Sequence, residues 1–316
     1  MGYVSVVIPC YRSARVLPAL VARLEAVLPT VCERYEIVLV VDGSPDGTWD
    51  TARQLALRVP AVRAMCLARN YGQHNALLAG VRAARHDVVV TMDDDLQHPP
   101  EEVPALLSAL TDDVDLVYGV AREEEHGFAR SLASRLVKAG LAGLLGVPDG
   151  RAMSAFRAFR TDLRTSFDRV AGPHVSVDVC LLWGTSRVGA VTVRMDRRDQ
   201  GRSGYTLRTL TRYAVNVIAG YSTAPLRLVT YLGFLVGAGG LALFVRVLWL
   251  YFAGVTTVPG FTTIAGMLAV LAAVQMLGLG VVGAYVGRLY ASGMGRPTYI
   301  IRDRVETGAE AAVTRG

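Results

Sequence analysis

The sequence predicts an α/β protein, in which a mostly parallel, doubly wound sheet domain is followed by a two-helix transmembrane hairpin. Short apolar runs alternate with segments of helical periodicity over residues 3–118, which is typical of the strands and helices of a parallel sheet. Two long apolar blocks near the C-terminus raise the hydrophobic content to 52% and the mean hydropathy to +0.35. Blocks of this kind indicate a membrane anchor.

Five predicted strands order the first part of the chain. They are Tyr3–Ile8, Glu36–Val41, Val62–Leu67, Asp87–Met92 and Asp115–Tyr118. Each contains a short apolar run of high β-propensity, as in strands that are buried on both faces of a parallel sheet. The helical patterns that separate them cover Ala14–Leu28, a segment ending near Val59, Asn75–Arg85 and Pro100–Leu110. A further strand is expected at 187–195.

Two helical patterns follow outside this alternation. Residues 128–147 are amphipathic, and this helix could pack on the sheet or lie in the membrane interface. A second helical run covers 206–220. We therefore expect a cytosolic domain at 1–205 and an amphipathic juxtamembrane segment at 206–226.

Two transmembrane helices are expected at about 228–252 and 261–287, within a membrane region of residues 227–290. At a rise of about 1.5 Å per residue, each helix is long enough to cross the bilayer core. Arginines lie outside both ends of the pair, whereas the loop between the helices has no charge. The positive-inside rule then places both termini, including a tail at 291–316, in the cytoplasm. The protein is expected in the inner or plasma membrane as a multi-pass protein.

Small residues in the apolar blocks suggest close helix packing. The pairs Gly233/Gly237 and Gly283/Gly287 have the G-x-x-x-G spacing that lets two helices approach closely. They could pack the hairpin on itself or join two protomers into a homo-oligomer, and the pattern does not choose between these arrangements.

Charge and cysteine content narrow the range of partners. The formal net charge is +6, and a basic protein with apolar blocks favours lipid head groups and phosphorylated substrates over nucleic acid. No basic patch interleaved with aromatic residues, as in RNA-binding proteins, is present. The four cysteines are scattered and contain no Cys-x-x-Cys pair, which argues against a zinc site.

Three consecutive carboxylates, Asp93, Asp94 and Asp95, follow an apolar run that ends at Met92. In open α/β sheets ligands bind just beyond the carboxyl ends of the strands. Adjacent carboxylates repel one another unless a cation lies among them, and Mg²⁺ commonly binds one or two carboxylates together with substrate phosphates. The pattern predicts a metal site for a phosphorylated ligand. The alternative is a solvated acidic loop that caps the helix after Pro99.

Five motifs in order resemble those of the family-2 glycosyltransferases, which have a GT-A (Rossmann-like) fold. They are Val7–Tyr11, Val40–Thr48, Asn70–Asn75, Asp93–Pro100 and Gly201–Tyr205. The chain resembles in particular the polyprenyl-phosphate branch of that family, the dolichyl-phosphate mannose synthase-like enzymes and the bacterial undecaprenyl-phosphate sugar transferases. The resemblance covers nearly the whole chain, including the hairpin.

The resemblance implies a role for individual residues. Asp93 and Asp95 would be the DxD pair that holds Mg²⁺ or Mn²⁺ on the nucleotide diphosphate, with Gln97 as a further oxygen ligand. The other residues expected to bind the nucleotide sugar are Pro9, Tyr11, Val40, Asp42, Asp94, Arg122 and Arg198. Asp95 and Arg198 would act in catalysis. The residues expected near the lipid phosphate are Arg202, Ser203 and Tyr205.

Three positions depart from the family pattern. Val41 and Ala155 stand where relatives commonly have an acidic residue, and Gly204 stands where many have a lysine. The acid missing at Ala155 is the one sometimes proposed as a catalytic base. A phosphomonoester has a second pKa of about 6 and needs little deprotonation at neutral pH, whereas a sugar hydroxyl does. The departure at Ala155 therefore favours a lipid-phosphate acceptor.

We expect an inverting, metal-dependent glycosyltransferase that moves a sugar from a nucleotide-sugar donor to a polyprenyl phosphate. The product would be a sugar donor for cell-envelope glycans or glycolipids. One alternative is a saccharide-accepting membrane glycosyltransferase, although such synthases usually carry a Gln-x-x-Arg-Trp segment and more spans. The other is a catalytically silent membrane scaffold that binds nucleotide sugars, for which the loss of acidity at Val41 and Ala155 would be a sign.

Overall fold

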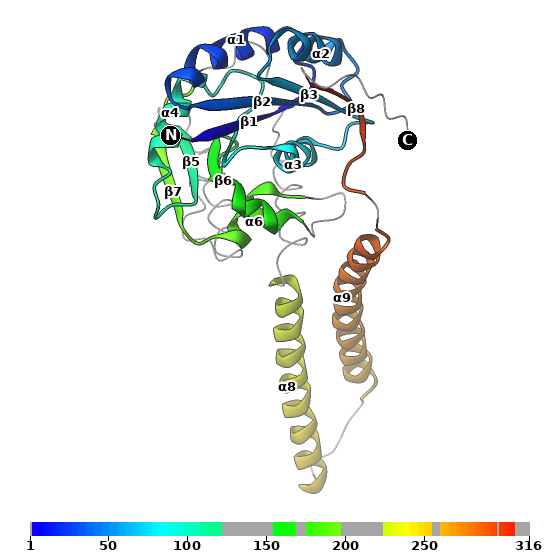
Figure 1. Ribbon diagram of the computed structural model, residues 1–316. Helices are drawn as coiled ribbons and strands as arrows, with labels where there is room; N and C mark the ends of the chain where they lie inside the picture. Colours follow the sequence, from blue (N-terminus) through cyan, green and yellow to red (C-terminus); the bar gives the residue numbers. More distant parts are fainter. Residues whose placement is uncertain are drawn as a thin grey trace. The chain divides into compact units, whose positions relative to one another are not determined.

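The computed structural model describes residues 2–121, 154–168, 175–196, 224–254, 260–295 and 297–306. The chain divides into two compact units. The first contains Met1–Arg208 together with Gly295–Gly316, and the second contains Thr209–Met294. The first unit is the expected α/β domain and the second contains two long helices (Figure 1). The helices expected at 128–147 and 206–220 lie outside the described residues.

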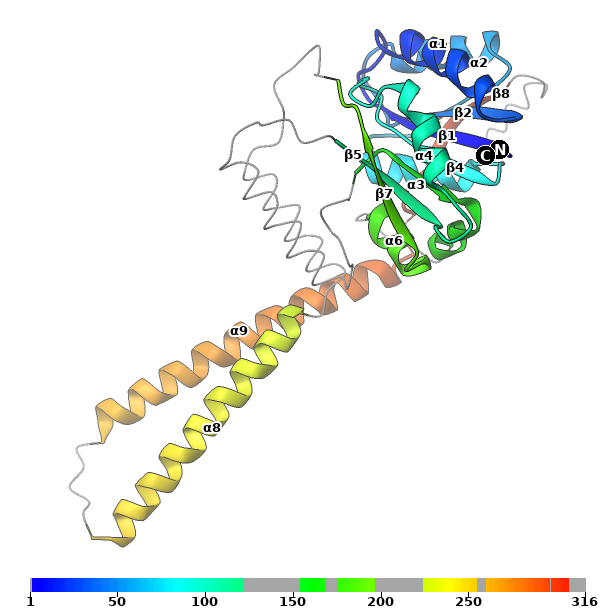
Figure 2. The ribbon, with the colours of Figure 1, turned by 90° about the vertical axis from the view of Figure 1, so that its left-hand side faces the viewer.

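An eight-stranded mixed sheet is the centre of the α/β domain, with the order β7-β5-β6-β4-β1-β2-β3-β8. The strands are β1 (Tyr3–Cys10), β2 (Arg34–Val41), β3 (Val62–Leu67), β4 (Val88–Thr91), β5 (Leu116–Ala121), β6 (Arg157–Arg160), β7 (Val188–Val193) and β8 (Ile301–Glu306). The strands β4, β1, β2 and β3 are parallel, as are β5 and β7, which lie side by side in Figure 2. Only β6 and β8 run antiparallel to their described neighbours. The predicted mostly parallel sheet is confirmed.

Helices cover both faces of this sheet. They are α1 (Leu17–Val27), α2 (Thr48–Arg58), α3 (Gln73–Ala83), α4 (Val103–Ala109) and α6 (Val177–Gly184), with short 3-10 helices η1 (Leu28–Thr30), η2 (Pro100–Glu102) and η4 (Thr161–Phe167). Figure 1 shows α1 and α2 on one side of the sheet and α3 and α6 on the other. Val6 and Ile8 contribute to the core under α1, whereas Val7 between them contributes to the core under α3. The sheet is therefore buried on both faces, which explains why its strands are continuous apolar runs.

The C-terminal segment differs from its prediction. We expected residues 291–316 to form a tail, but residues 301–306 form β8, which pairs antiparallel with β3. The strand was not predicted because four of its six residues are charged, a composition that is common in edge strands. The antiparallel β6 and the helix α6 were not predicted either.

A group of charged side chains fastens β8 to the sheet; we call it the amino-edge network. It consists of Ser5, Glu36, Arg63, Arg85 and Glu306. Arg63 donates hydrogen bonds to Glu36 Oε2 and to Glu306 Oε1, both at 2.7 Å. Arg85 Nη2 donates to Glu306 Oε2 at 2.7 Å, and Ser5 Oγ donates to Glu36 Oε1 at 2.6 Å. These residues lie at the amino ends of the parallel strands or just before them, with Glu306 ending β8, so the network closes the edge opposite the carboxyl ends.

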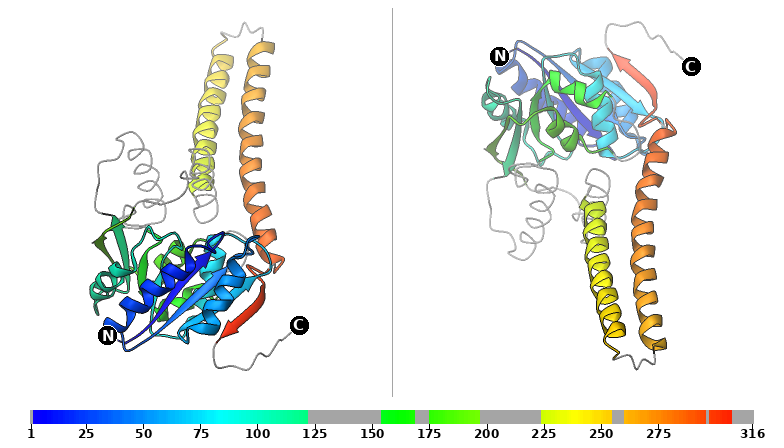
Figure 3. Two further views of the ribbon diagram at one scale, coloured as in Figure 1. Left: turned by 90° about the horizontal axis from the view of Figure 1, so that it is seen from above. Right: turned by 90° about the horizontal axis from the view of Figure 1, so that it is seen from below.

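The second unit is an antiparallel pair of helices, α8 (Ala224–Phe252) and α9 (Phe261–Gly293), which Figure 3 shows side by side. Within them, Val229–Phe252 and Val270–Gly287 are long and apolar enough to cross a membrane. Apolar side chains on both helices are exposed, and those of Trp249 and Phe252 reach 76% and 79% exposure. A surface of this kind suits a lipid environment rather than water.

The glycine pairs do not bring α8 and α9 together. A Cβ atom added at Gly233, Gly237, Gly283 or Gly287 would meet no heavy atom within 4 Å in the described part of the chain. The hairpin approaches more closely at Gly278, where such an atom would lie 3.4 Å from Val229 Cγ1. The arrangement in which the G-x-x-x-G pairs pack the hairpin on itself is therefore absent among the described residues.

Candidate active site

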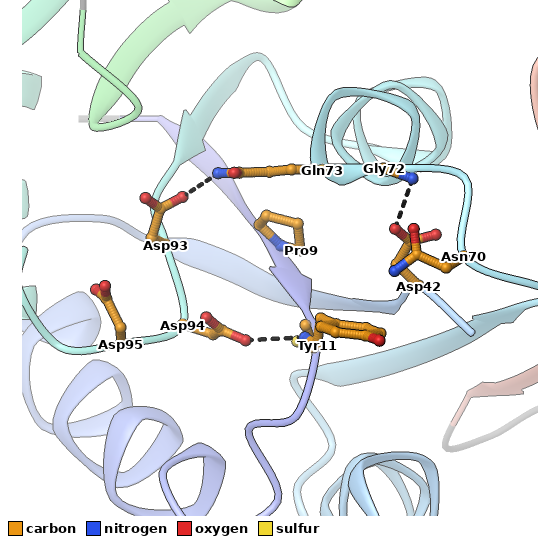
Figure 4. Close-up of a pocket in the computed structure, with 10 residues that line it drawn as sticks. Pro9, Tyr11, Asp42, Asn70, Gly72, Gln73, Asp93, Asp94 and Asp95 are labelled. Atoms are coloured by element: carbon orange, nitrogen blue, oxygen red, sulfur yellow. Dashed lines mark hydrogen bonds between the residues drawn. The ribbon is translucent and has the colours of Figure 1, made fainter. Parts of the chain in front are cut away.

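A pocket opens where the parallel strands β1, β2, β3 and β4 end, an edge of the sheet that we call the carboxyl edge (Figure 4). Four chain segments, each at the end of one of these strands or shortly after it, supply its walls. The lining residues are Pro9, Cys10, Tyr11, Asp42, Asn70, Gly72, Gln73, Asp93, Asp94 and Asp95. This is where ligands bind in open α/β sheets.

The three consecutive aspartates point in different directions. Asp93 Oδ1 accepts a hydrogen bond at 2.6 Å from the Nε2 atom of Gln73, the first residue of α3. Asp94 Oδ2 accepts one at 3.0 Å from the backbone N–H of Tyr11. Both bonds are drawn in Figure 4. Asp95 Oδ1 accepts one at 3.1 Å from the backbone N–H of Gln97. The segment 93–97, the acidic loop, is thus attached to Tyr11, the residue after β1, and to the start of α3.

Asp42 organises the opposite wall of the pocket. The residue is 3% exposed, and its carboxylate accepts hydrogen bonds from the backbone N–H groups of Tyr71 at 2.7 Å and Gly72 at 2.8 Å. Burial raises the pKa of Asp42, although the two N–H groups act in the opposite direction. Gly72 has a φ of +94°, a conformation that other residues rarely adopt, so glycine is needed where α3 begins.

The loop after β2 is held mainly by its own polar side chains. Ser44 Oγ accepts from the backbone N–H of Arg12 at 2.9 Å and donates to Asp46 Oδ1 at 2.6 Å. Asp46 Oδ1 also accepts from the hydroxyl of Thr48, the first residue of α2, at 2.6 Å. Ser44 and Asp46 therefore have the structural role that their position before a helix suggests.

The residues that line the pocket suit a hard divalent cation that shares its ligands with a phosphate. The carboxylate and amide oxygens here are of the type that Mg²⁺ and Mn²⁺ prefer, and none of the described lining residues is basic. Burial raises the pKa of Asp94, and the negative charge of Asp95 adds to this rise. Among the described residues no group of three or more His, Cys, Asp or Glu is arranged to hold a metal alone. A cation at one or two of these carboxylates would take its other ligands from phosphate oxygens and water.

Most of the residues predicted for the site and described here lie in this pocket. Those that line it are Pro9, Tyr11, Asp42, Asp93, Asp94 and Asp95. Gln97 is not a lining residue, but its backbone N–H contacts Asp95. The predicted residues outside the described part of the chain are Arg122, Arg198, Arg202, Ser203 and Tyr205.

Val40 has a different place from the one expected. Its side chain is fully buried in the core on the α3 side of the sheet, together with Val7 and Met65. Val40 lies two residues before Asp42 and inside the strand, so it packs in the core and does not line the pocket. We leave it out of the proposed binding residues.

Four lining residues were not singled out from the sequence: Cys10, Asn70, Gly72 and Gln73. The last three belong to the Asn70–Asn75 motif, which is the sequence feature that could have identified them. The contact of Gln73 with Asp93 depends in addition on the loop conformation that Gly72 allows. Burial raises the pKa of the Cys10 thiol well above its usual range, so this thiol is not a ready nucleophile.

The sequence is similar to that of known proteins. Residues 5–164 match the family model described as Glycosyl transferase family 2. An undecaprenyl-phosphate 4-deoxy-4-formamido-L-arabinose transferase from Yersinia enterocolitica is 32% identical over 310 residues, which cover 97% of this chain and 94% of that protein. A protein of the same name from Pseudomonas aeruginosa is 33% identical over 313 residues, covering 98% and 92%.

Solved structures share the fold. The crystal structure of glucosyl-3-phosphoglycerate synthase from Mycobacterium tuberculosis with phosphoglyceric acid matches with a TM-score of 0.50 and 24% identity, covering 68% of this chain and 77% of that chain. The same synthase with Mn²⁺, UDP-glucose and phosphoglyceric acid matches with a TM-score of 0.50 and 23% identity, over the same shares of both chains.

Proposed function

The chain belongs to glycosyltransferase family 2, and from this premise we propose that it transfers a sugar from a nucleotide-sugar donor to undecaprenyl phosphate or a similar polyprenyl phosphate. The observation that carries the proposal is an acidic pocket at the carboxyl edge of a chain that also has two membrane-length helices. The relatives named undecaprenyl-phosphate transferases match nearly the whole chain, hairpin included, which supports the same acceptor. The sugar in the names of these relatives, 4-deoxy-4-formamido-L-arabinose, is therefore one donor group to test.

We assign the donor to the pocket lined by the acidic loop. Pro9, Tyr11 and Asp42 would contact the nucleoside, and Asp93 and Asp95 would hold Mg²⁺ or Mn²⁺ beside the diphosphate. Gln97 would add an oxygen ligand. When bound, the cation would neutralise the charge that develops on the leaving diphosphate as the anomeric bond breaks. A solved structure of the same fold contains Mn²⁺ with UDP-glucose, which supports a divalent ion.

Two arginines are proposed as further diphosphate ligands. Arg122 follows Ala121, the last residue of β5, which runs parallel to β4 because both are antiparallel to β6. Arg198 comes two residues after Asp196, whose backbone N–H donates to the carbonyl oxygen of Gln97 at 3.0 Å. Two residues span at most about 7 Å of chain, so this anchor supports the proposal that Arg198 binds beside the acidic loop. Guanidinium groups bind phosphate oxygens in a bidentate manner.

The acceptor would react through a phosphate oxygen. That oxygen attacks the anomeric carbon on the face opposite the nucleotide, the bond to the diphosphate breaks, and the anomeric configuration inverts. No base is required, because a phosphomonoester with a second pKa of about 6 is already ionised at neutral pH. This agrees with Ala155, which has no acidic group to offer. Arg202, Ser203 and Tyr205 would bind the lipid phosphate, with Asp95 and Arg198 closest to the reacting groups.

The chain's connectivity supports a single orientation in the membrane. Both ends of the α8–α9 hairpin continue into the α/β domain, because the chain returns to the sheet as β8. A hairpin of two spans leaves that domain on one side of the membrane. The arginines outside both helix ends favour the cytoplasmic side of the inner or plasma membrane. The exposed G-x-x-x-G pairs would remain available to a second protomer.

A donor and acceptor panel tests the proposal. The purified full chain in detergent would receive Mg²⁺ or Mn²⁺, undecaprenyl phosphate and one of several UDP-, GDP- or dTDP-linked sugars, among them UDP-glucose and the UDP-linked 4-deoxy-4-formamido pentose. Release of nucleoside diphosphate is measured with and without the lipid. Asp95→Asn is the inactive control, and Asp113→Asn, at an exposed position between α4 and β5, is its matched partner.

We expect lipid-dependent release with one donor, its loss in Asp95→Asn and its retention in Asp113→Asn. Transfer to a saccharide where the lipid fails would favour the saccharide-accepting alternative. Nucleotide binding without turnover for every donor and acceptor would favour the silent scaffold.

A further inference from the structure

A buried arginine lies beside the acidic loop without lining the pocket. Arg157, in β6, is 1% exposed and has one of the largest fully buried side chains in the described part of the protein. It pairs across the sheet with Thr91 of β4 and with Tyr118 of β5. These three side chains therefore form one row across β5, β6 and β4. Thr91, at the β4 end of the row, lies two residues before Asp93 in the chain.

Each polar group in this row has a partner. Arg157 Nε donates to Thr91 Oγ1 at 2.9 Å, and Thr91 Oγ1 donates to the carbonyl oxygen of Ala155 at 2.8 Å. Asp178, in the first turn of α6, accepts hydrogen bonds from Arg157 Nη1 and, at 3.1 Å, from the hydroxyl of Tyr118. We call Thr91, Tyr118, Arg157 and Asp178 the carboxyl-edge network.

Stability alone does not explain an ion pair between a fully buried arginine and an aspartate whose side chain is only 16% exposed. Removing an arginine and a carboxylate from water costs several kcal/mol per ion, and well-packed apolar side chains of similar volume often serve as well or better. The contacts of Arg157 do join the elements that carry them. Here those elements are β4, β5, β6 and α6.

The network also reaches the acidic loop by a second route. The backbone N–H of Val177, next to Asp178, makes a long hydrogen bond of 3.4 Å to Nδ1 of His74 in α3. The preceding residue, Gln73, donates to Asp93 at 2.6 Å. Since Asp93 follows Thr91 by two residues, the contacts form a closed ring from β4 through β6, α6 and α3 back to the acidic loop.

We propose that Arg157 is a positioning residue for the donor site, which fixes the acidic loop through Thr91 and the start of α3 through Asp178. This inference rests on the proposed function, because it assigns Asp93 to the metal and the donor diphosphate. Arg157 itself touches neither ligand. Its loss would let the end of β4 and the Gln73 side chain shift relative to each other, and Asp93 would lose its orientation.

The chain supplies a matched control. Arg63 is also a buried arginine with carboxylate partners, Glu36 and Glu306, but it belongs to the amino-edge network. Arg63→Met removes the same chemistry from the same sheet at the edge opposite the pocket. A loss that arises from a weakened fold should appear in this variant too.

The test measures binding as well as turnover in the full chain in detergent. UDP, GDP and dTDP are titrated with Mn²⁺ by calorimetry, and the nucleotide that binds the wild type is used for Arg157→Met, Arg157→Lys and Arg63→Met. Thr91→Val and Thr91→Ser form a second pair, because valine has the shape of threonine without its hydroxyl and serine keeps the hydroxyl. Thermal unfolding of each variant and the separate kcat and KM values for the donor are recorded.

We expect Arg157→Met and Thr91→Val to weaken Mn²⁺-dependent nucleotide binding about 10- to 100-fold, as is common for residues that orient metal ligands. Arg157→Lys should recover part of the affinity and Thr91→Ser most of it. Arg63→Met should unfold at a lower temperature and bind like the wild type.

The positioning role would be excluded if a folded Thr91→Val or Arg157→Met bound the metal and nucleotide as the wild type does. It would also be excluded if Arg63→Met weakened binding to the same extent, since the effect would then belong to the fold. Failure of the wild type to bind any of the three nucleotides would instead refute the proposed function, and the positioning role with it.

Discussion

The two edges of the central sheet use similar side chains in opposite ways. At the amino edge, Glu36 and Glu306 each accept hydrogen bonds from arginine groups, and Arg63 joins them. At the carboxyl edge, the acidic loop has hydrogen bonds from neutral donors, the amide of Gln73 and the backbone N–H groups of Tyr11 and Gln97. Arginines therefore pair with the carboxylates of the amino edge, whereas these three donors to the acidic loop are uncharged. In the proposed function, a cation bound with the ligand adds positive charge at the acidic loop.

The largest effect is expected at the carboxyl edge itself. Asp93→Asn should lower sugar transfer about 10²- to 10³-fold, as the loss of one group that stabilises transition-state charge commonly does. The same variant should unfold at the same or a higher temperature, because one of three neighbouring negative charges is gone. Transfer assays and thermal unfolding of the same sample check both points. A variant that unfolds much earlier and keeps its activity would reverse the roles of the two edges.

At the amino edge the effect should be on stability. Arg63→Met leaves Glu36 buried without its cation, so we expect the free energy of unfolding to fall by about 3 kcal/mol. Chemical denaturation measures the change, and the KM for the donor should stay the same. A raised KM without loss of stability would show that the two edges are coupled.

Gly43, which lies two residues after the end of β2, tests how tightly the carboxyl edge is packed. Gly43 has a φ of +54°, and a Cβ atom there would lie 2.2 Å from the backbone carbonyl carbon of Arg69. Gly43→Ala should therefore cost about 1–3 kcal/mol and disturb the pocket wall formed by Asn70. Gly47→Ala is the matched control, since a Cβ atom at that position meets nothing within 4 Å. Equal stability of the two variants would contradict the described loop.

Acid should weaken the amino edge by a smaller amount. Burial alone would raise the pKa of Glu36, but hydrogen bonds from Ser5, Arg63 and Arg85 outweigh it and hold the pKa below its ordinary value of 4.5. The pKa of Glu306 is also lowered, by its arginine partners against the effect of burial. A carboxylate with a lowered folded pKa stabilises the protein above the unfolded value, and this contribution is lost as the pH falls through the folded value.

We therefore expect the stability of the wild type to decline as the pH falls below 4.5. Glu306→Gln should show a shallower decline, because one of the two carboxylates no longer titrates. Thermal unfolding between pH 6 and about pH 3 compares the slopes. Parallel curves would mean that Glu306 does not contribute to acid sensitivity.

The sequence predicts the parts of the fold that depend on local pattern. The strand Val62–Leu67 has the predicted bounds, and the acidic loop follows a buried strand as expected. Both depend on short apolar runs that end abruptly. Val40 was assigned to the site because its motif contains it, although its place inside β2 puts the side chain in the core.

Long-range pairing explains what the sequence does not predict. The strand β8 meets β3 across more than two hundred residues of chain, through ion pairs such as that of Glu306 with Arg63, and no local periodicity encodes it. Similarly, Arg157 meets Thr91 and Asp178 only after β6 inserts antiparallel between β4 and β5. Gln73 donates to Asp93 from the start of α3, directly after the positive φ of Gly72. Neither this backbone conformation nor the contact can be read from the sequence motif.

The most direct test of sugar transfer at the carboxyl edge is the mass of the lipid product. The full chain, the donor selected by the panel and undecaprenyl phosphate are incubated with Mg²⁺ or Mn²⁺, and the lipid fraction is analysed by mass spectrometry. We expect undecaprenyl phosphate that carries one sugar, formed by the wild type and by Arg63→Met, and absent with a chelator or with Asp93→Asn. A sugar-bearing lipid formed equally well by Asp93→Asn, or a sugar found only on a saccharide acceptor, would contradict the proposed function.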